Sequence, residues 1–278
     1  MEIVLVLLNN FQEYILDNIH NLLRLQNNDI TVIADEKYIN HFKEYNINFI
    51  CVEHIIIDYE NYIKECNNTF RNGFWKLTTL RFLIIKEYMK INNKTNIVHI
   101  ENDVLLYKNI NEIYFHNKEK ILITMDSEKR CIPGLLFIPN YILLERCYNN
   151  FIKTLNDMEN WAKCYYELND IVDTLPIFIE NNDNVISNNI TKNYKFYNAI
   201  FDAAAIGQYL GGIDPRNNDP RNKIGFVNET CIFNYSKYSF KWINNENNIK
   251  IPYITISNQD IPIINLHIHS KNLKAFII

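Results

Sequence analysis

The chain has 278 residues, a formal net charge of −4 at pH 7, and a composition that is 47% hydrophobic and 13% aromatic. This composition excludes a disordered chain, and the lack of a Lys/Arg block excludes the electrostatic surface that duplex nucleic acid requires. The length favours one α/β domain with appended elements, and the sequence gives no indication of an oligomeric state.

The N-terminus, MEIVLVLLNN, is apolar but too short to span a membrane, and it lacks the basic residues of a signal peptide. We therefore expect no transmembrane segment. The six cysteines are scattered without a Cys-x-x-Cys pair, as expected of reduced thiols. Asn, Ile, Lys and Tyr, whose codons are AT-rich, are abundant, which indicates a low-GC bacterium, a protozoan or a large DNA virus. The expected location is the cytoplasm, or the host cytoplasm for a viral protein.

Strand and helix patterns alternate at the start of the chain. The order is a strand at 2–8, a helix at 12–25, a strand at 29–35, a short helix at 37–45 and a strand at 47–53. This order predicts a parallel sheet buried on both faces, with ligands bound beyond the carboxyl ends of its strands. Asn9, Asn10 and Asp35 fall there, either beside a nucleotide or as ordinary turn residues.

A long helix is predicted at 72–90, with Leu77, Leu80 and Ile84 on its apolar stripe. Arg81 emerges from the same side of this helix. A buried guanidinium needs a carboxylate or a phosphate partner, so Arg81 forms either an internal salt bridge or a contact to a ligand.

An acidic Glu-Asn-Asp sequence follows the predicted strand 96–100. In extended backbone Glu101 and Asp103 project to the same side and Asn102 to the other. Two buried carboxylates this close repel each other, and Mn²⁺ or Mg²⁺, which prefers such hard oxygen ligands, resolves that repulsion. The similar pair Asp126 and Glu128 leads into polar sequence and is interpreted as a solvated turn.

Three of the six glycines lie in FDAAAIGQYLGGIDPRN, residues 201–217, which indicates tight turns or a close backbone approach. Asp202 occupies an N-cap position of a predicted short helix. The same carboxylate is placed to orient or deprotonate a hydroxyl, and the two interpretations are compatible. Asp214, which precedes a proline, is interpreted as a turn residue.

The predicted last strand, in IPIINLHIHSKNL at 261–273, places His267 and His269 on one face, with Lys271 just beyond. Imidazole completes a mixed oxygen and nitrogen coordination sphere, while lysine supplies a point charge for a phosphate. Together with Glu101 and Asp103, these side chains predict a metal and phosphate site.

Several segments, taken in order, resemble the glycosyltransferases of the GT-A fold, of a type found in bacteria and large DNA viruses. They are RNGFWKLTTLRFLIIKEYM, NIVHIENDVLLY, IPGLLFIPN, FDAAAIGQYLGGIDPRN and NLHIHSK. The resemblance spans nearly the whole chain. It implies a mostly parallel Rossmann-type sheet in one domain, 1–278, with a nucleotide-sugar-binding half at 1–125 and an acceptor half at 126–278. It also implies a nucleotide-sugar donor, most often a UDP-sugar, a hydroxyl acceptor such as a glycan, and Mn²⁺ or Mg²⁺.

Carried over to this chain, the Asp-x-Asp metal motif of the family matches Glu101 to Asp103, with Glu in place of the first Asp. The family's C-terminal metal-binding histidine matches His267 or His269. Asp202 resembles the family's catalytic or acceptor-binding carboxylate, a base if the reaction inverts the anomeric centre and a positioning group if it retains it. Lys271 resembles a diphosphate contact of the family. The residues predicted to bind the donor are Asn9, Asn10, Asp35, Lys76, Arg81, Glu101, Asn102 and Lys271.

Two other classes of function remain open on the sequence. A metal-dependent nucleotidyltransferase also uses paired carboxylates on an α/β sheet, but a Gly-rich basic loop would be expected after its first strand, and LLNNFQEY has none. A catalytically inactive nucleotide-sugar-binding module would retain donor binding without turnover.

Overall fold

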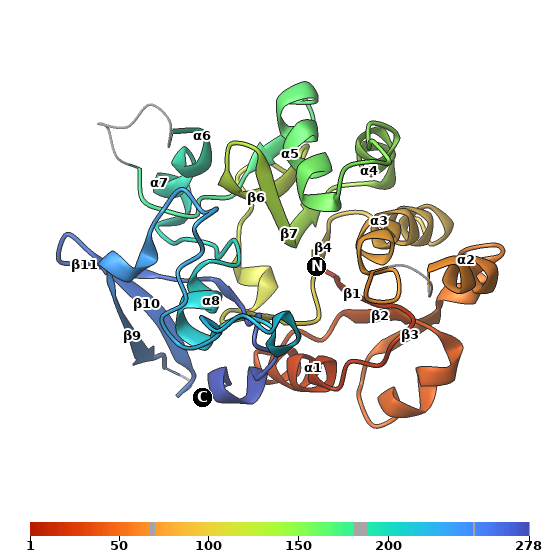
Figure 1. The fold of residues 1–278 in the computed structure, drawn as a ribbon, viewed down its shortest axis with the longest axis horizontal. Helices are drawn as coiled ribbons and strands as arrows, with labels where there is room; N and C mark the ends of the chain where they lie inside the picture. Colours follow the sequence, from red (N-terminus) through yellow and green to blue (C-terminus); the bar gives the residue numbers. More distant parts are fainter. Residues whose placement is uncertain (67–69, 181–187, 247, 278) are drawn as a thin grey trace.

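The computed structural model describes residues 1–66, 70–180, 188–246 and 248–277. Within these ranges, seven strands form the central sheet in the order β3-β2-β1-β4-β7-β6-β8 (Figure 1). Their bounds are β1 Ile3–Leu7, β2 Ile30–Ala34, β3 Asn48–Cys51, β4 Ile97–Ile100, β6 Ile121–Ser127, β7 Arg130–Ile138 and β8 Val172–Thr174. β3, β2, β1 and β4 run parallel, β7 is antiparallel to both of its neighbours, and β6 pairs parallel with β8. The predicted α/β class with a mostly parallel sheet is confirmed.

The sheet separates two apolar cores, and this explains the continuous apolar run of β1. Ile3, Leu5 and Leu7 pack with helix α1, Tyr14–Arg24, whereas Val4 and Val6 pack with helix α3, Phe74–Ile91. Helices α4, Tyr141–Asn149, and α5, Asp157–Glu167, lie on the same side of the sheet as α3, and α1 lies on the opposite side (Figure 1). Alternate residues of a strand face opposite sides, so a strand covered on both faces must be apolar throughout.

The segments next to the edge strand β3 differ from their predicted form. The predicted helix at 37–45 is a 3₁₀ segment, Glu36–Phe42, in which Phe42 is the buried residue, so no apolar stripe stabilises an α-helix. The predicted strand at 47–53 ends at Cys51 because Cys51 pairs with Ala34, where β2 itself ends. Val52–His54 then forms another 3₁₀ turn.

The C-terminal part of the chain returns to the end of β4. β12, Asn265–His267, pairs antiparallel with β5, Val104–Leu106, and His267 lies opposite Val104. Helix α8, Ile206–Gly211, packs on β12 so closely that a Cβ on Gly207 would lie 2.1 Å from the carbonyl oxygen of His267. The glycine in this helix therefore permits the tail to reach the acidic segment.

Short elements complete the described chain. They are α2 Tyr59–Cys66, η3 Ile110–Glu112, α6 Asn188–Thr191, α7 Tyr194–Tyr197, η5 Pro215–Asn217, η6 Tyr235–Lys237 and η7 Leu273–Phe276, with β9 Ser239–Asn244, β10 Lys250–Ile256 and β11 Gln259–Pro262 in a separate antiparallel sheet. Of the helices described, none has the length and apolar character that crossing a bilayer requires. The predicted division into halves at residue 125 stays a prediction, although it falls within β6.

The interpretation of Asp126 and Glu128 as a solvated turn is wrong for Asp126. This residue is 0% exposed near the end of β6, and its carboxylate accepts hydrogen bonds from Arg130 across the β6–β7 hairpin. Burial raises the pKa of Asp126, and the arginine opposes that rise. The hairpin turns sharply enough that a partner four residues later in sequence reaches back to the carboxylate.

Candidate metal centre

The acidic segment 101–103 is a tight turn at the carboxyl end of β4. The backbone N–H of Val104 donates to the carbonyl of Glu101 at 2.9 Å, and Asn18 on α1 donates to the carbonyl of Asn102 at 3.1 Å. The side chain of Asn102 points away from the two acids and donates to the carbonyl of Val6 at 3.0 Å. The predicted opposition of Asn102 to its neighbours is thus confirmed, but a turn produces it rather than extended backbone.

Glu101, Asp103 and His267 form a carboxylate–histidine cluster whose ligand atoms all lie within 4.8 Å of one another. The Nε2 atom of His267 lies 3.1 Å from Oδ2 of Asp103 and 3.3 Å from Oε2 of Glu101. The β5–β12 pairing brings the histidine to the acids, and Gly134 of β7 leaves room for the ring, because a Cβ there would lie 3.0 Å from Nδ1 of His267. Two carboxylates and one imidazole suit a small divalent cation.

Positive charge surrounds Asp103 in this structure. Lys271 forms an ion pair with its Oδ2 atom, and Asp103 is only 5% exposed. Burial alone would raise the pKa of Asp103, but His267 and Lys271 hold it well below its usual value. Burial would lower the pKa of His267, and the charges of Asp103 and Glu101 raise it above its usual value. A divalent cation can take over the role of these positive charges next to Asp103.

Arg81 connects the cluster to helix α5. Its guanidinium donates to Oε1 of Glu101 and, at 2.9 Å, to Oδ2 of Asp157, and the residue is 7% exposed. The salt-bridge interpretation of Arg81 is therefore confirmed, and a ligand contact stays a prediction. Glu101 is divided between Arg81 and His267, which leaves Asp103 as the principal carboxylate of the cluster. Sequence reasoning missed Asp157, whose signal was its place in the first turn of an amphipathic helix.

Asp202 joins helix α8 to the tail. Its carboxylate accepts hydrogen bonds from the backbone N–H groups of Ile206 at 2.9 Å, Gly207 at 2.8 Å and His267 at 2.9 Å. Burial raises the pKa of Asp202, and these three hydrogen bonds oppose the rise. The predicted N-cap position is wrong, because α8 begins at Ile206 and Ala205 is its N-cap, although the Asp202 carboxylate still accepts from the first turn of the helix. The catalytic role stays a prediction.

The two histidines of the tail have different surroundings because β12 ends at His267. His269 lies beyond the strand, its ring centre is 5.7 Å from that of His267, and its Nδ1 accepts the backbone N–H of Asp214 at 3.2 Å. Burial, followed by the charges of Lys271 and His267, lowers the pKa of His269 to about 4. The described residues therefore place His267 with the carboxylates and His269 beside it.

The predicted nucleotide-side residues lie at the carboxyl ends of β1 and β2. The backbone N–H of Asn9 donates to Oδ2 of Asp35 at 2.9 Å, and the hydroxyl of Tyr59 donates to the same oxygen at 3.3 Å. Asn10 and Lys76 are exposed, the latter in the first turn of α3. Contacts between these residues and a nucleotide stay predictions.

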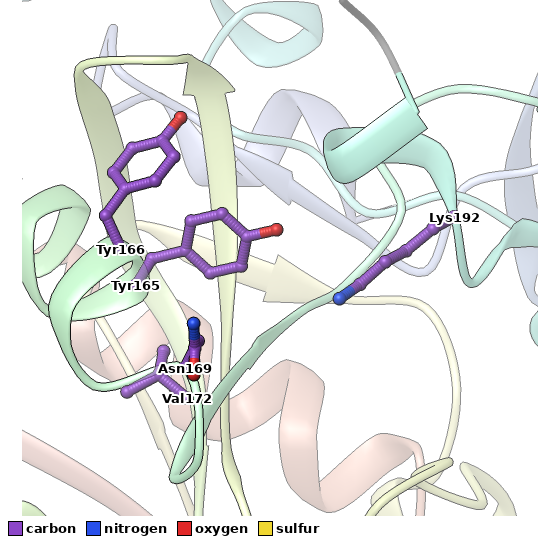
Figure 2. A pocket seen from close by; sticks show the side chains of 5 residues that line it. All are labelled: Tyr165, Tyr166, Asn169, Val172 and Lys192. Atoms are coloured by element: carbon purple, nitrogen blue, oxygen red, sulfur yellow. The ribbon is translucent and has the colours of Figure 1, made fainter. Parts of the chain in front are cut away.

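A separate pocket of about 230 Å³ lies at the amino end of β8, at the opposite edge of the sheet from the cluster (Figure 2). Tyr165, Tyr166, Asn169, Val172 and Lys192 line it. The ammonium group of Lys192 lies 5.7 Å from the ring centre of Tyr165. None of these residues belongs to the carboxylate–histidine cluster.

Beside this pocket, Asp173 is expected to make stability dependent on pH. Its carboxylate accepts from His116 at 3.2 Å and pairs with Lys192; burial would raise its pKa, but these partners lower it. A depressed carboxylate pKa stabilises the fold above the unfolded value of about 4, and this contribution is lost as the pH falls. Urea unfolding should therefore show Asp173→Asn to cost about 1 to 2 kcal/mol at pH 7 and clearly less at pH 2, because the contribution is lost only as the pH falls toward the lowered folded-state pKa. An equal cost at both values would contradict the charge-based origin.

The fold and this cluster define an α/β protein with a candidate divalent-cation centre at the carboxyl edge of its sheet.

No protein-family model and no curated protein matches the chain. Among solved structures, mouse xyloside xylosyltransferase 1 is 13% identical, with a TM-score of 0.42 over 63% of this chain and 84% of that one. The galactosyltransferase LgtC, bound to donor and acceptor sugar analogues, is 12% identical, with a TM-score of 0.40 over 63% and 73%. A cytidylyltransferase from Leptospira borgpetersenii is 12% identical, with a TM-score of 0.41 over 66% and 77%. Scores at this level do not assign a function.

Proposed function

We propose that the protein is a metal-dependent glycosyltransferase that moves a sugar from a nucleotide-sugar donor, a UDP-sugar, to a hydroxyl of an acceptor glycan. The observation that carries the proposal is the meeting of Glu101, Asp103 and His267 at the carboxyl end of β4, with Lys271 beside them. The segments that supply these residues are those in which the sequence resembles GT-A glycosyltransferases. We further propose a cytoplasmic location, supported by the six cysteines, which are all free thiols.

In this proposal, Asp103 and His267 hold Mn²⁺ or Mg²⁺, and Glu101 completes the ligand set or orients it from its salt bridge with Arg81. When bound, the cation supplies a positive charge that stabilises the departing nucleoside diphosphate. The ammonium group of Lys271, which lies beside Asp103, would stabilise the same developing negative charge. The carboxylate of Asp202 keeps the first turn of α8 against the tail, and we propose that its free lone pairs orient the acceptor hydroxyl.

Binding of the donor is expected to depend on the metal. Because a cation held by Asp103 and His267 would attract the diphosphate, a UDP-sugar together with Mn²⁺ should raise the melting temperature more than the sum of the two separate shifts. The measurement is a thermal-shift screen of nucleotide sugars with and without Mn²⁺. A shift by the metal alone, unaffected by every nucleotide sugar, would contradict the donor assignment.

The products distinguish the alternative functions. Release of UDP and free or transferred sugar supports glycosyl transfer, because the bond broken lies between the sugar and the diphosphate. Release of inorganic pyrophosphate from a nucleoside triphosphate would instead establish a nucleotidyltransferase. Metal-dependent donor binding without either product would establish an inactive binding module.

A further inference from the structure

The tetrapeptide Asp-Pro-Arg-Asn occurs twice in close succession, at 214–217 and at 219–222. The two copies have the same local geometry. The backbone N–H of Arg216 donates to Asp214 at 2.9 Å, and that of Arg221 donates to Asp219 at 2.8 Å. In both copies the guanidinium also donates to both oxygens of the same carboxylate. The two copies of the tetrapeptide can therefore be compared directly, because only their surroundings in the fold differ.

The first copy is fixed between two parts of the candidate site. Its Asp214 is 4% exposed and donates its backbone N–H to Nδ1 of His269 at 3.2 Å. From the other side, the guanidinium of Arg71 donates to the carbonyl of Arg216 at 3.0 Å and to Oδ1 of Asn217 at 2.7 Å. The segment therefore spans from the histidine-bearing tail to the residues that precede α3.

Contacts through Asp214 hold Arg216 near the cluster. The guanidinium pairs with Asp214, Asp214 donates its backbone N–H to His269, and the ring centre of His269 lies 5.7 Å from that of His267. The pKa of Arg216 is raised, first by its hydrogen bond to Asp214 and further by the charges of Asp214 and Asp103. The ammonium group of Lys271 lies over the ring of Tyr14, 5.6 Å from the ring centre. Arg216 and Lys271 therefore approach Asp103 from two segments of the chain.

The second copy has no such surroundings. The pKa of Arg221 is raised first by its hydrogen bond to Asp219, and the remaining influences come from Asp219 and Glu229. Its guanidinium donates to Glu229 at 2.9 Å. Both of these acids lie outside the candidate site, so Arg221 is a matched control for Arg216.

We propose that Arg216 is a second diphosphate-binding cation, which leaves Asp214 and binds the diphosphate of the nucleotide donor opposite Lys271. This inference rests on the proposed function and adds a residue to it. The side chain of Arg216 is 64% exposed, so its rotation away from Asp214 disturbs no core packing, and Asp214 keeps the backbone N–H of Arg216 as a hydrogen-bond donor. The planar guanidinium offers paired donors that match two phosphate oxygens, whereas lysine offers a point charge. Asp214 holds the guanidinium of Arg216 beside the site before the ligand binds.

Titration calorimetry with inorganic pyrophosphate and with UDP, each at saturating Mn²⁺, tests the inference. Arg216→Gln should weaken both ligands about tenfold or more, the effect of losing a charge-assisted contact, while Arg221→Gln leaves both unchanged. Arg216→Lys should recover part of the lost affinity, because lysine keeps the positive charge but lacks the paired N–H donors of the guanidinium. The double variant Asp214→Asn/Arg216→Gln removes both charges, leaves no unpaired carboxylate, and should show the same loss as Arg216→Gln, which separates ligand binding from folding.

Equal affinities for Arg216→Gln and the wild type would overturn the inference and leave the proposed function standing. An equal loss in Arg216→Gln and Arg221→Gln would also overturn it, since the effect would then come from overall charge. If the wild type binds neither pyrophosphate nor UDP at any Mn²⁺ concentration, both the inference and the proposed function fail.

Discussion

Asp103→Ala is expected to abolish metal-dependent turnover, with at least about a hundredfold loss in the rate of UDP-sugar hydrolysis at saturating Mn²⁺. The reason is that Asp103 is the carboxylate of the cluster that both His267 and Lys271 contact, at 5% exposure, whereas Glu101 is shared with Arg81. Release of UDP from candidate UDP-sugars gives the rate, and calorimetry of Mn²⁺ alone gives the metal affinity. The rate of UDP release and the affinity for Mn²⁺ should both fall.

Two further variants control for loss of folding. Asp103→Asn retains the shape of the side chain and a hydrogen-bonding oxygen for His267, so it should fold normally and still lose metal affinity. Asp126→Ala removes another buried carboxylate that is paired with a cation, and should cost stability while the affinity for Mn²⁺ stays at the wild-type value. If Asp103→Asn kept wild-type turnover and metal affinity, the cluster would not be the metal centre.

Patterns within single segments of the sequence predicted the strands and the helix that form the core of the N-terminal half. The apolar runs of β1, β2 and β4 and the stripe of α3 each depend on a periodicity within one segment, and all are present. The antiparallel position of β7 between β4 and β6 was not predicted. It depends on pairing between segments far apart in the chain, which no single segment encodes.

The candidate site shows the same division between local and long-range information. Residue type and spacing indicated Glu101, Asp103, His267 and Lys271. The choice between the two histidines required the pairing of β12 with β5, which ends at His267 and leaves His269 outside the strand. The partners of Arg81 were equally inaccessible, because Glu101 and Asp157 reach it only in the folded chain.

The buried salt bridges of Arg81 predict a large loss of stability when this residue is replaced. Arg81 joins α3, the turn after β4 and the first turn of α5 through Glu101 and Asp157. Arg81→Met keeps much of the side-chain volume but leaves two carboxylates without their cation, one of them the 3% exposed Asp157. Removing one partner of a buried ion pair costs about 3 to 5 kcal/mol. Urea unfolding at pH 7 should show a loss of this size.

A double-mutant cycle with Asp157 separates this structural role from the ligand contact predicted for Arg81. If Asp157→Asn is combined with Arg81→Met, the loss should be smaller than the sum of the two single losses, because the buried carboxylate is no longer left charged and unpaired. The coupling arises from the direct contact of 2.9 Å between Arg81 and Asp157. Additive losses would show that the salt bridge contributes nothing. If Arg81→Met has near-wild-type stability and weakened donor binding, Arg81 binds the ligand instead. An arginine that mainly stabilises the fold lowers the free energy of unfolding when it is replaced, even without donor.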